Sequence, residues 1–148
     1  MITRRRLLAL APLPAALVAP ASAFASVGPL PVPGGVGGVP DCLSSWRQGL
    51  PALQWDGDLA LECEAWAAYM SLTWIKRGDV FNHAPRWRGR ECIARLLPTD
   101  DWARAIGVWA ASPDHLPILQ RSDARRVGMG GWRAASGLPF WCLRMEAR

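Results

Sequence analysis

Residues 56–74, DGDLALECEAWAAYMSLTW, are the most periodic stretch of the 148-residue chain and indicate its fold most directly. Asp56 and Asp58 open the stretch, and aspartate at this position accepts hydrogen bonds from the free amides of a first helical turn. Apolar side chains then follow at steps of three and four residues, which places them on one helical face. They are Leu59, Cys63, Trp66, Ala67, Met70 and Trp74. The stretch therefore predicts a long amphipathic helix.

One further helix is predicted before this helix, and another is predicted after it. Residues 41–48 favour a short helix that ends before Gly49. Thr99, Asp100 and Asp101 open another helix, which Pro113 stops. Its apolar stripe consists of Trp102, Ala105, Ile106 and Trp109. We expect the tryptophans on the helical stripes to belong to the core rather than to a sugar-stacking surface.

The end of the chain has the pattern of a small antiparallel sheet. Residues 125–132 (RRVGMGGW) and 138–145 (LPFWCLRM) are separated by 133–137 (RAASG), which is typical of a β-hairpin. Residues 91–97 (ECIARLL) can form another strand, although their periodicity is ambiguous. Helices first and a sheet late predict an α+β layered domain over residues 41–148.

The start of the chain has the features of an export signal. Residues 1–25 combine basic residues at Arg4 to Arg6, an apolar run over 7–20 and small residues around Ala21 to Ala25. Prolines interrupt the run, so we expect a cleaved Sec or twin-arginine signal rather than a transmembrane segment of the mature protein. Residues 26–40, rich in proline and glycine, are interpreted as a poorly packed linker. The expected location is periplasmic or secreted.

The charge of the mature chain argues against a dedicated nucleic-acid binder, which usually keeps a stronger basic excess. The formal charge is +5, and it falls to +2 without the three arginines of the predicted signal. Four arginines cluster around Trp87, either as a patch for anionic polymers or as a solvated loop. They are Arg86, Arg88, Arg90 and Arg95. Trp87 and Trp132 lie off the apolar stripes, so an envelope-glycan site would depend on these two as exposed residues.

The four cysteines lie far apart in the sequence, at Cys42, Cys63, Cys92 and Cys142. None forms a C-x-x-C pair of the kind that binds zinc or performs thiol exchange. In an oxidising compartment an even number of dispersed cysteines predicts two disulfides. Three pairings remain open.

The motifs of the chain occur in the order seen in the CAP superfamily, and the sequence resembles its short bacterial members. This superfamily comprises cysteine-rich secretory proteins, antigen 5 and plant pathogenesis-related proteins. The resemblance covers residues 42–145. It rests on GLPALQWDGDLALECEAWAAYM (49–70), His83, RECIA (90–94), VWAASPDHLPIL (108–119), VGMGGW (127–132) and PFWCLRM (139–145).

The resemblance implies an α-β-α sandwich with a central cleft of two histidines and acidic residues. The matching positions are His83, Glu91 and His115, which in the family can hold a divalent cation such as zinc. Two neutral imidazoles and a carboxylate with water suffice for a tetrahedral site. We expect the three residues to form one hydrogen-bonded or metal-bridged cluster, in which the carboxylate raises the pKa of the imidazoles.

The chain also departs from the family pattern. Residues 90–92 correspond to a Gly-Glu-Asn (GEN) motif of the family, and here Arg90 and Cys92 replace its glycine and asparagine. Cys42 replaces an asparagine that is common in the first helix of the family. The second acidic position of the family pattern falls near Ser112 and is not matched by an aspartate or glutamate here. The metal cluster implied by the resemblance is therefore incomplete.

Three functions are compatible with these features. The first is a non-catalytic exported binding module whose cleft receives a small ligand, a lipid or an envelope partner. The alternative is a hydrolase of peptide or cell-wall material, with a metal-bound water as nucleophile. The third is a structural protein of the envelope that contacts anionic glycans.

Overall fold

The computed structural model describes residues 27–32, 39–77, 82–87 and 89–147. Its helices are α1 (Asp41–Ser45), α2 (Gly57–Arg77), α3 (Trp102–Ala110) and α4 (Leu116–Leu119), with a short 3₁₀ helix η1 (Pro85–Trp87). Its strands are β1 (Gly28–Pro29), β2 (Gln54–Trp55), β3 (Glu91–Arg95), β4 (Arg126–Arg133) and β5 (Pro139–Glu146).

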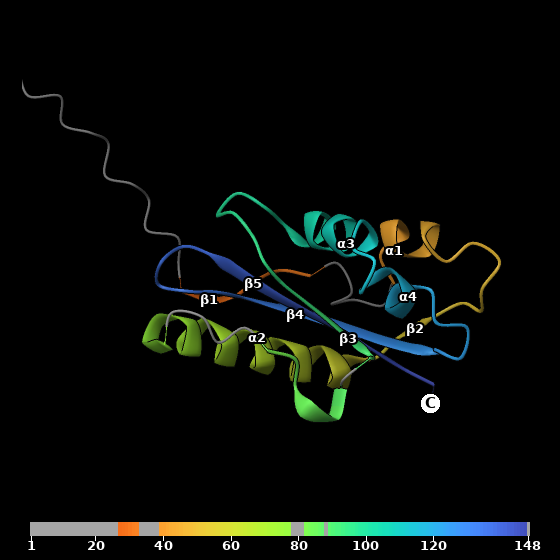
Figure 1. Cartoon of the computed structure of the whole chain (residues 1–148), viewed down its shortest axis with the longest axis horizontal. Coiled ribbons are helices and arrows are strands. Elements are labelled where there is room, and N and C mark those ends of the chain that lie inside the picture. Colours follow the sequence, from red (N-terminus) through yellow and green to blue (C-terminus); the bar gives the residue numbers. More distant parts are fainter. Residues whose placement is uncertain (1–26, 33–38, 78–81, 88, 148) are drawn as a thin grey trace, which may run out of the picture.

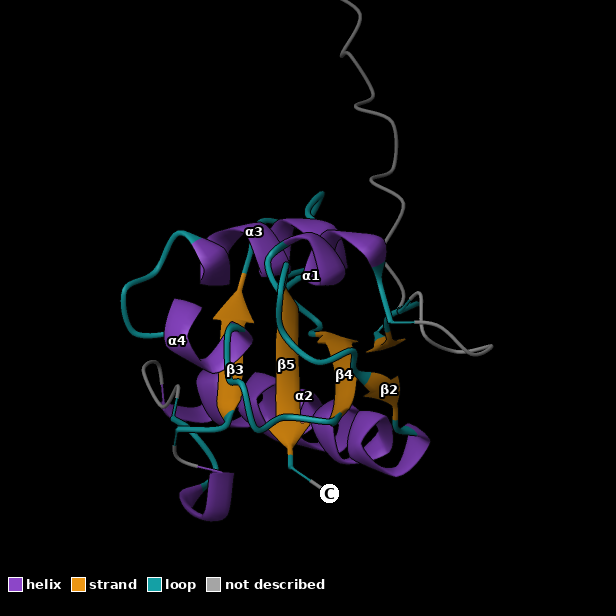
Figure 2. Cartoon of the chain, turned by 90° about the vertical axis from the view of Figure 1, so that its right-hand side faces the viewer, coloured by secondary structure: helices purple, strands orange, loops and turns teal. Residues whose placement is uncertain are grey.

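The described strands form one sheet in the order β1-β4-β5-β3, and β2 pairs in parallel with β4. Helix α2 covers one face of the sheet, whereas α1, α3 and α4 cover the other face (Figures 1 and 2). β4 and β5 are antiparallel neighbours over their whole length, which confirms the predicted hairpin. The predicted α+β class with an α-β-α sandwich is therefore confirmed.

Helix α2 forms as its sequence pattern predicts. Asp56 Oδ1 accepts a hydrogen bond from Leu59 N at 3.0 Å, which satisfies one of the free amides of the first turn. The side chains of Leu59, Cys63 and Met70 are buried against the sheet. The face that the sequence marks as apolar is thus the face that packs.

Two glycines of β4 allow α2 to lie directly on the strand. A β-carbon at Gly130 would lie 2.3 Å from the backbone nitrogen of Glu64, and one at Gly128 would lie 2.3 Å from the backbone nitrogen of Ala60. Real β-carbons do not approach backbone atoms this closely, so the helix and the strand touch through their main chains. This contact fixes the depth of α2 above the sheet.

The opposite layer is built around α3. Its Trp109 is fully buried, and the indole Nε1 donates a hydrogen bond to the carbonyl of Ile93 on β3 at 2.9 Å. The other stripe tryptophans, Trp66, Trp74 and Trp102, are half-buried and pack against the core. The predicted core role of the stripe tryptophans is confirmed.

Asp101 caps α3, and its removal should destabilise the protein moderately. Its Oδ1 accepts a hydrogen bond from Arg104 N at 3.1 Å, which satisfies a backbone amide without an intrahelical partner. We expect Asp101→Ala to lower the free energy of unfolding by about 1 kcal/mol. Urea denaturation checks the value, with Asp101→Asn as the control that keeps a capping oxygen. Equal losses in the two variants would contradict a capping role.

The prediction that residues 26–40 are poorly packed is wrong for the described part. β1 pairs with β4, and Leu30 N donates a hydrogen bond to the Gly131 carbonyl at 2.9 Å. Leu30, Val32 and Val39 also pack against the core. The prolines of this arm suppress a regular period, but its apolar side chains still bury surface. Residues 33–38 and the predicted signal at 1–25 lie outside the described residues, and the domain boundaries stay a prediction.

No helix among the described residues is long and apolar enough to cross a bilayer.

Candidate functional site

Glu91 is the buried centre of the site. It opens β3 and is fully buried. The Oε1 atom accepts a hydrogen bond from Ala84 N at 2.9 Å and lies 3.2 Å from His83 Nδ1. Because a carboxylate only accepts hydrogen bonds, Nδ1 of His83 carries the proton in this contact. Glu91 therefore holds the segment before η1 in place.

Arg144 neutralises the charge of Glu91. The two residues face each other in the β3–β5 register, and Arg144 Nε donates to Glu91 Oε2 at 2.8 Å. Arg144 is itself only 3% exposed. Its guanidinium also contacts Glu62 Oε2 at 3.1 Å and lies 4.9 Å from the Trp87 ring centre. Both carboxylate oxygens of Glu91 are thus engaged by donors of this chain.

The two histidines lie close together but have different partners. Their ring centres are 5.9 Å apart, and the planes are tilted by 45°. His115 Nδ1 lies 2.9 Å from Ser112 Oγ and not against Glu91. A hydroxyl therefore orients the second imidazole here.

Strand alternation explains why Glu91 reaches one histidine only. Successive side chains of β3 point to opposite faces. Ile93, two residues after Glu91, packs on the α2 side, whereas Cys92 packs on the side of α3 and α4. Cys92 Sγ lies 4.0 Å from the carbonyl of His115, which places His115 on that opposite side. The edge strand β3 separates Glu91 from His115, and His83 lies between them.

The pKa values follow from these contacts. Burial acts to raise the pKa of Glu91, but hydrogen bonds from His83, Ala84 and Arg144 outweigh it and leave the pKa below its ordinary value of 4.5. Burial lowers the pKa of His115 below its ordinary value of 6.5, and the nearby His83 lowers it further. The expectation that Glu91 raises the pKa of both imidazoles is therefore wrong for His115, since that ring does not contact the carboxylate.

These shifts predict a loss of stability in acid, in two stages. His115 has a lower pKa folded than unfolded, so its contribution is lost as the pH falls below 6.5. The pKa of Glu91 is also lower in the folded than in the unfolded state, so its contribution to stability is lost as the pH falls below 4.5. Denaturant unfolding from pH 8 to pH 3 with a chelator present measures both stages. His115→Gln should flatten the upper stage only, and a stability that rises from pH 7 to pH 5 would contradict the prediction.

The described side chains do not form a complete metal site. Over the described ranges, no group of three or more histidine, cysteine, aspartate and glutamate residues is arranged to hold an ion. A catalytic zinc needs three protein ligands and an open position. Glu91 is engaged by Arg144, so the donors left are the two imidazoles. The role of His83, Glu91 and His115 as metal ligands therefore stays a prediction.

All four cysteines carry free thiols in the structure, so the two predicted disulfides are not confirmed. Burial raises the pKa of Cys92 and of Cys142 above the ordinary value. Both therefore stay protonated at neutral pH, which disfavours a cysteine nucleophile.

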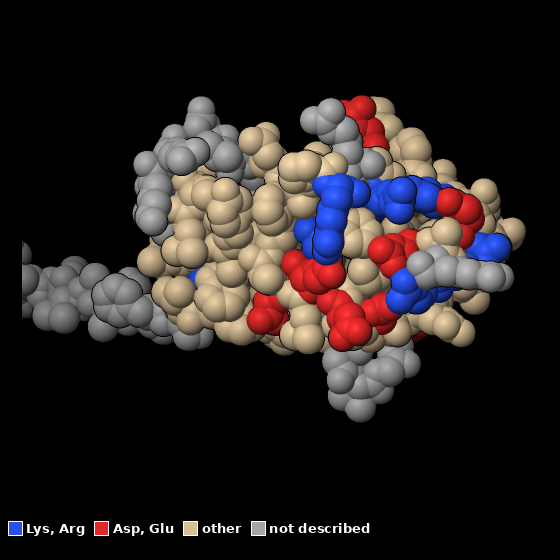
Figure 3. Space-filling model, turned by 90° about the horizontal axis from the view of Figure 1, so that it is seen from below, with Lys and Arg blue, Asp and Glu red and all other residues tan. Residues whose placement is uncertain are grey.

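The expectation of an exposed Trp87 is wrong. Trp87 is 5% exposed because η1 folds its ring against α2 and Arg144, whereas Trp132 is half-buried against the core. Two of the nearby arginines are also engaged: Arg86 contacts Glu62 at 2.5 Å, and Arg95 lies 3.8 Å from the Trp74 ring centre. Figure 3 views the molecule from the side of α2 and shows basic and acidic side chains interspersed at one end of it. A glycan site that depends on an exposed Trp87 is therefore not supported.

Sequence reasoning missed two residues of the site, Arg144 and Ser112. An arginine inside the apolar strand 138–145, in phase with Cys142, is a signal of a buried partner charge. Ser112 is three residues before His115, a spacing at which one turn brings side chains together. Both signals were present in the sequence.

Known proteins support the fold and the family. Residues 46–142 match the Cysteine-rich secretory protein family, CAP. A comparison with curated proteins found no significant match. Among solved structures, MpPR-1i, in crystals soaked with selenourea, is 18% identical with a TM-score of 0.51 over 72% of this chain and 85% of that chain. An outer surface protein from Borrelia burgdorferi is 17% identical with a TM-score of 0.48 over 70% of this chain and 86% of that chain.

The likeness to MpPR-1i concerns the fold alone, whereas the family match covers more than half of the sequence and confirms the resemblance seen in the motifs. The chain therefore belongs to the Cysteine-rich secretory protein (CAP) family.

Proposed function

We propose that this chain is an exported CAP-domain binding module and that its cleft at His83 and His115 receives a ligand without performing chemistry on it. The engagement of Glu91 carries the proposal. Its two oxygens accept hydrogen bonds from Arg144, Ala84 and His83. A carboxylate held in this way is not free to act as a general base, which must reach the proton that it removes.

The two imidazoles supply the polar part of the binding site. The hydrogen bonds of both rings use Nδ1, to Glu91 and to Ser112. The Nε2 atoms are then left to donate to or accept from a ligand. The side chain of His83 is 37% exposed, so a ligand can reach it from solvent. This arrangement suits a small ligand with a hydroxyl, carboxylate or phosphate group.

An apolar groove next to this segment supports a ligand with an apolar part. It has a volume of about 540 Å³, within the range of small-molecule sites. Trp66 and Tyr69 of α2 line this groove, and their stacked rings have centres 4.9 Å apart. Ala84 also lines the groove and is the next residue after His83. A lipid or an envelope molecule with a polar head and an apolar body fits this combination.

The alternative, a divalent-metal hydrolase, needs groups that the described residues do not bring together. Two imidazoles without a third ligand bind a cation weakly. Glu91, whose two oxygens already accept hydrogen bonds, is not free to act as the base. Export itself is inferred from residues 1–25, whose basic start and apolar run have the pattern of a signal.

NMR of the histidine side chains tests the proposal. Dodecylphosphocholine below its micelle concentration and a soluble peptidoglycan fragment are the probes, each added to the purified full chain. We expect one of them to shift the resonances of both rings. In His83→Ala the shift of the remaining His115 ring should be lost, whereas the control variant Gln54→Ala, distant from the site, should keep both shifts. Zinc-stimulated release of peptide or sugar from cell-wall material would contradict the proposal, as would unchanged resonances with both probes.

A further inference from the structure

The sheet divides the four cysteines into two sets. Cys142 lies opposite Ile93 in the β3–β5 register, and both pack on the α2 side together with Cys63. Cys92 lies opposite Leu143, and both pack on the other side, where Cys42 also lies. Any pairing that mixes the sets would have to pass through the sheet. Of the three pairings left open by the sequence, one keeps both bridges on single sides.

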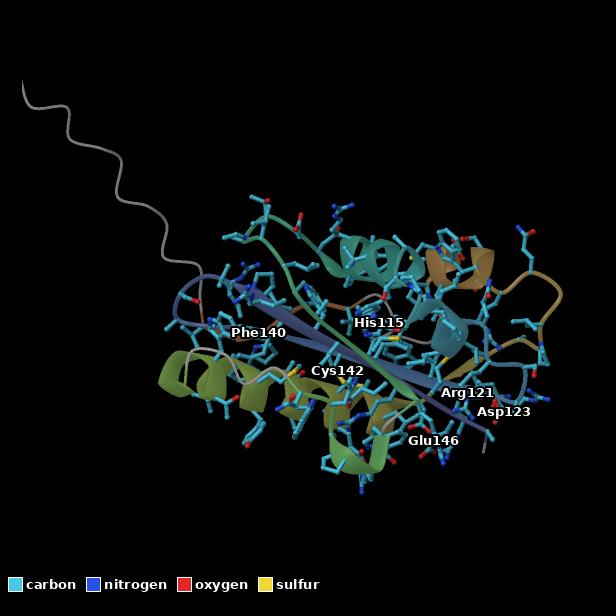
Figure 4. All side chains as sticks on the ribbon, viewed as in Figure 1. His115, Arg121, Asp123, Phe140, Cys142 and Glu146 are labelled. Carbon is cyan, nitrogen blue, oxygen red and sulfur yellow. The ribbon has the colours of Figure 1, made fainter. Side chains whose placement is uncertain are left out.

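Within the α2 set the two cysteines lie in one buried cluster, and both are fully buried. Cys142 faces Gly130 in the β4–β5 register, and a β-carbon at Gly130 would lie 2.3 Å from the nitrogen of Glu64, the residue after Cys63. Cys63 Sγ also lies 3.4 Å from the carbonyl of Gly128, which neighbours Arg144 on β5. Figure 4 shows Cys142 between β5 and α2, with His115 on the opposite side of the sheet. The main-chain contact at Gly128 and Gly130 brings α2 close to the strand pair that carries Cys142.

We propose that Cys63 and Cys142 form a disulfide that links α2 to β5 when the chain folds in contact with a disulfide donor. In the exchange, one thiolate attacks the donor disulfide and releases one donor thiol. The second cysteine then attacks the mixed disulfide and releases the other. The protein loses two electrons and two protons, and the donor R–S–S–R becomes two R–SH. The disulfide requires such a donor, which is supplied if the chain is exported as proposed above. It does not depend on what the cleft binds.

Burial determines when the disulfide forms. Both sulfurs are inaccessible in the folded protein, so a donor reaches them during folding or through an open state. Once formed, the disulfide is equally protected from reductants. Its formation removes the thiol of Cys142 that lies 3.6 Å from Glu91 Oε2, while the bonds from Arg144, Ala84 and His83 to Glu91 persist.

Peptide mapping identifies the pair without any substitution. Each cysteine falls in a different tryptic peptide: 7–47, 48–76, 91–95 and 134–144. The reduced, unfolded full chain is refolded with oxidised and reduced glutathione, free thiols are alkylated, and the chain is digested without reduction. We expect peptide 48–76 linked to 134–144. A link from either peptide to 7–47 or 91–95, or full alkylation of Cys63 and Cys142 in the refolded protein, would overturn the proposal.

The thermal midpoint provides the second readout. The oxidised chain should unfold at a temperature higher than the reduced chain by on the order of 10 °C. Cys42→Ser, which prevents any bridge on the other side of the sheet, should keep a difference between the oxidised and reduced chains, and adding Cys63→Ala to it should abolish that difference. A difference that survives in the double variant would place the stabilising bridge elsewhere and contradict the assignment.

Discussion

Arg144→Met should lower the free energy of unfolding by about 3–5 kcal/mol, which is the usual cost of breaking a buried ion pair from one side. The substitution removes the donor 2.8 Å from Glu91 Oε2 and leaves a fully buried carboxylate without a positive partner. Glu62 would lose the same guanidinium, but it lies at the surface, where water replaces the contact. Denaturant unfolding at pH 7 measures the loss.

Two variants separate the charge effect from lost packing. Adding Glu91→Gln to Arg144→Met removes the unpaired charge and should recover a large part of the stability. Asp123→Asn breaks the exposed pair with Arg121 and should change the stability little, because water screens that pair. If Arg144→Met were as mild as Asp123→Asn, the buried pair would not be the anchor of the site.

Gly130→Val should cost about 3 kcal/mol, since it forces side-chain atoms into a space already filled by backbone. A β-carbon there would lie 2.3 Å from the nitrogen and 2.7 Å from the α-carbon of Glu64. Backbone of a 21-residue helix cannot give way locally, so α2 must lift from β4 along its length. Thermal and denaturant unfolding measure the effect.

The matched control is Gly107→Ala in α3. A β-carbon at Gly107 meets no atom within 4 Å, and alanine is the better helix former. This variant should raise the stability by about 0.5–1 kcal/mol. If both substitutions had the same sign, the close contact between α2 and β4 would not determine the packing of this layer.

Much of the fold could be predicted because its longest elements have regular periods. α2 has buried residues at three- and four-residue steps from Leu59 to Met70, and the hairpin strands are separated by a short turn with a glycine. Helix α4 has only four residues, too few for a period. The packed arm before α1 escaped prediction because prolines break its pattern, and its two-residue strand depends on the edge that β4 offers.

The site was predictable as a set of residues but not as a set of contacts. The motif order indicates that His83, Glu91 and His115 come together, and the structure brings the two rings within 5.9 Å. Which groups bond to Glu91 depends on the β3–β5 register, and a single sequence does not state it. The same register places Arg144 against Glu91 and sorts the cysteines between the two faces of the sheet.

Calorimetric titration of zinc into the purified full chain at pH 7 tests the central claim most directly. Because Arg144, Ala84 and His83 already donate hydrogen bonds to both oxygens of Glu91, we expect no one-to-one binding of zinc with micromolar or tighter affinity. The control titration uses His83→Ala, which should give the same heats as the unchanged chain. Tight one-to-one binding that disappears in His83→Ala would show that the cleft is a metal centre and would contradict the account of Glu91 as an anchor of the binding site.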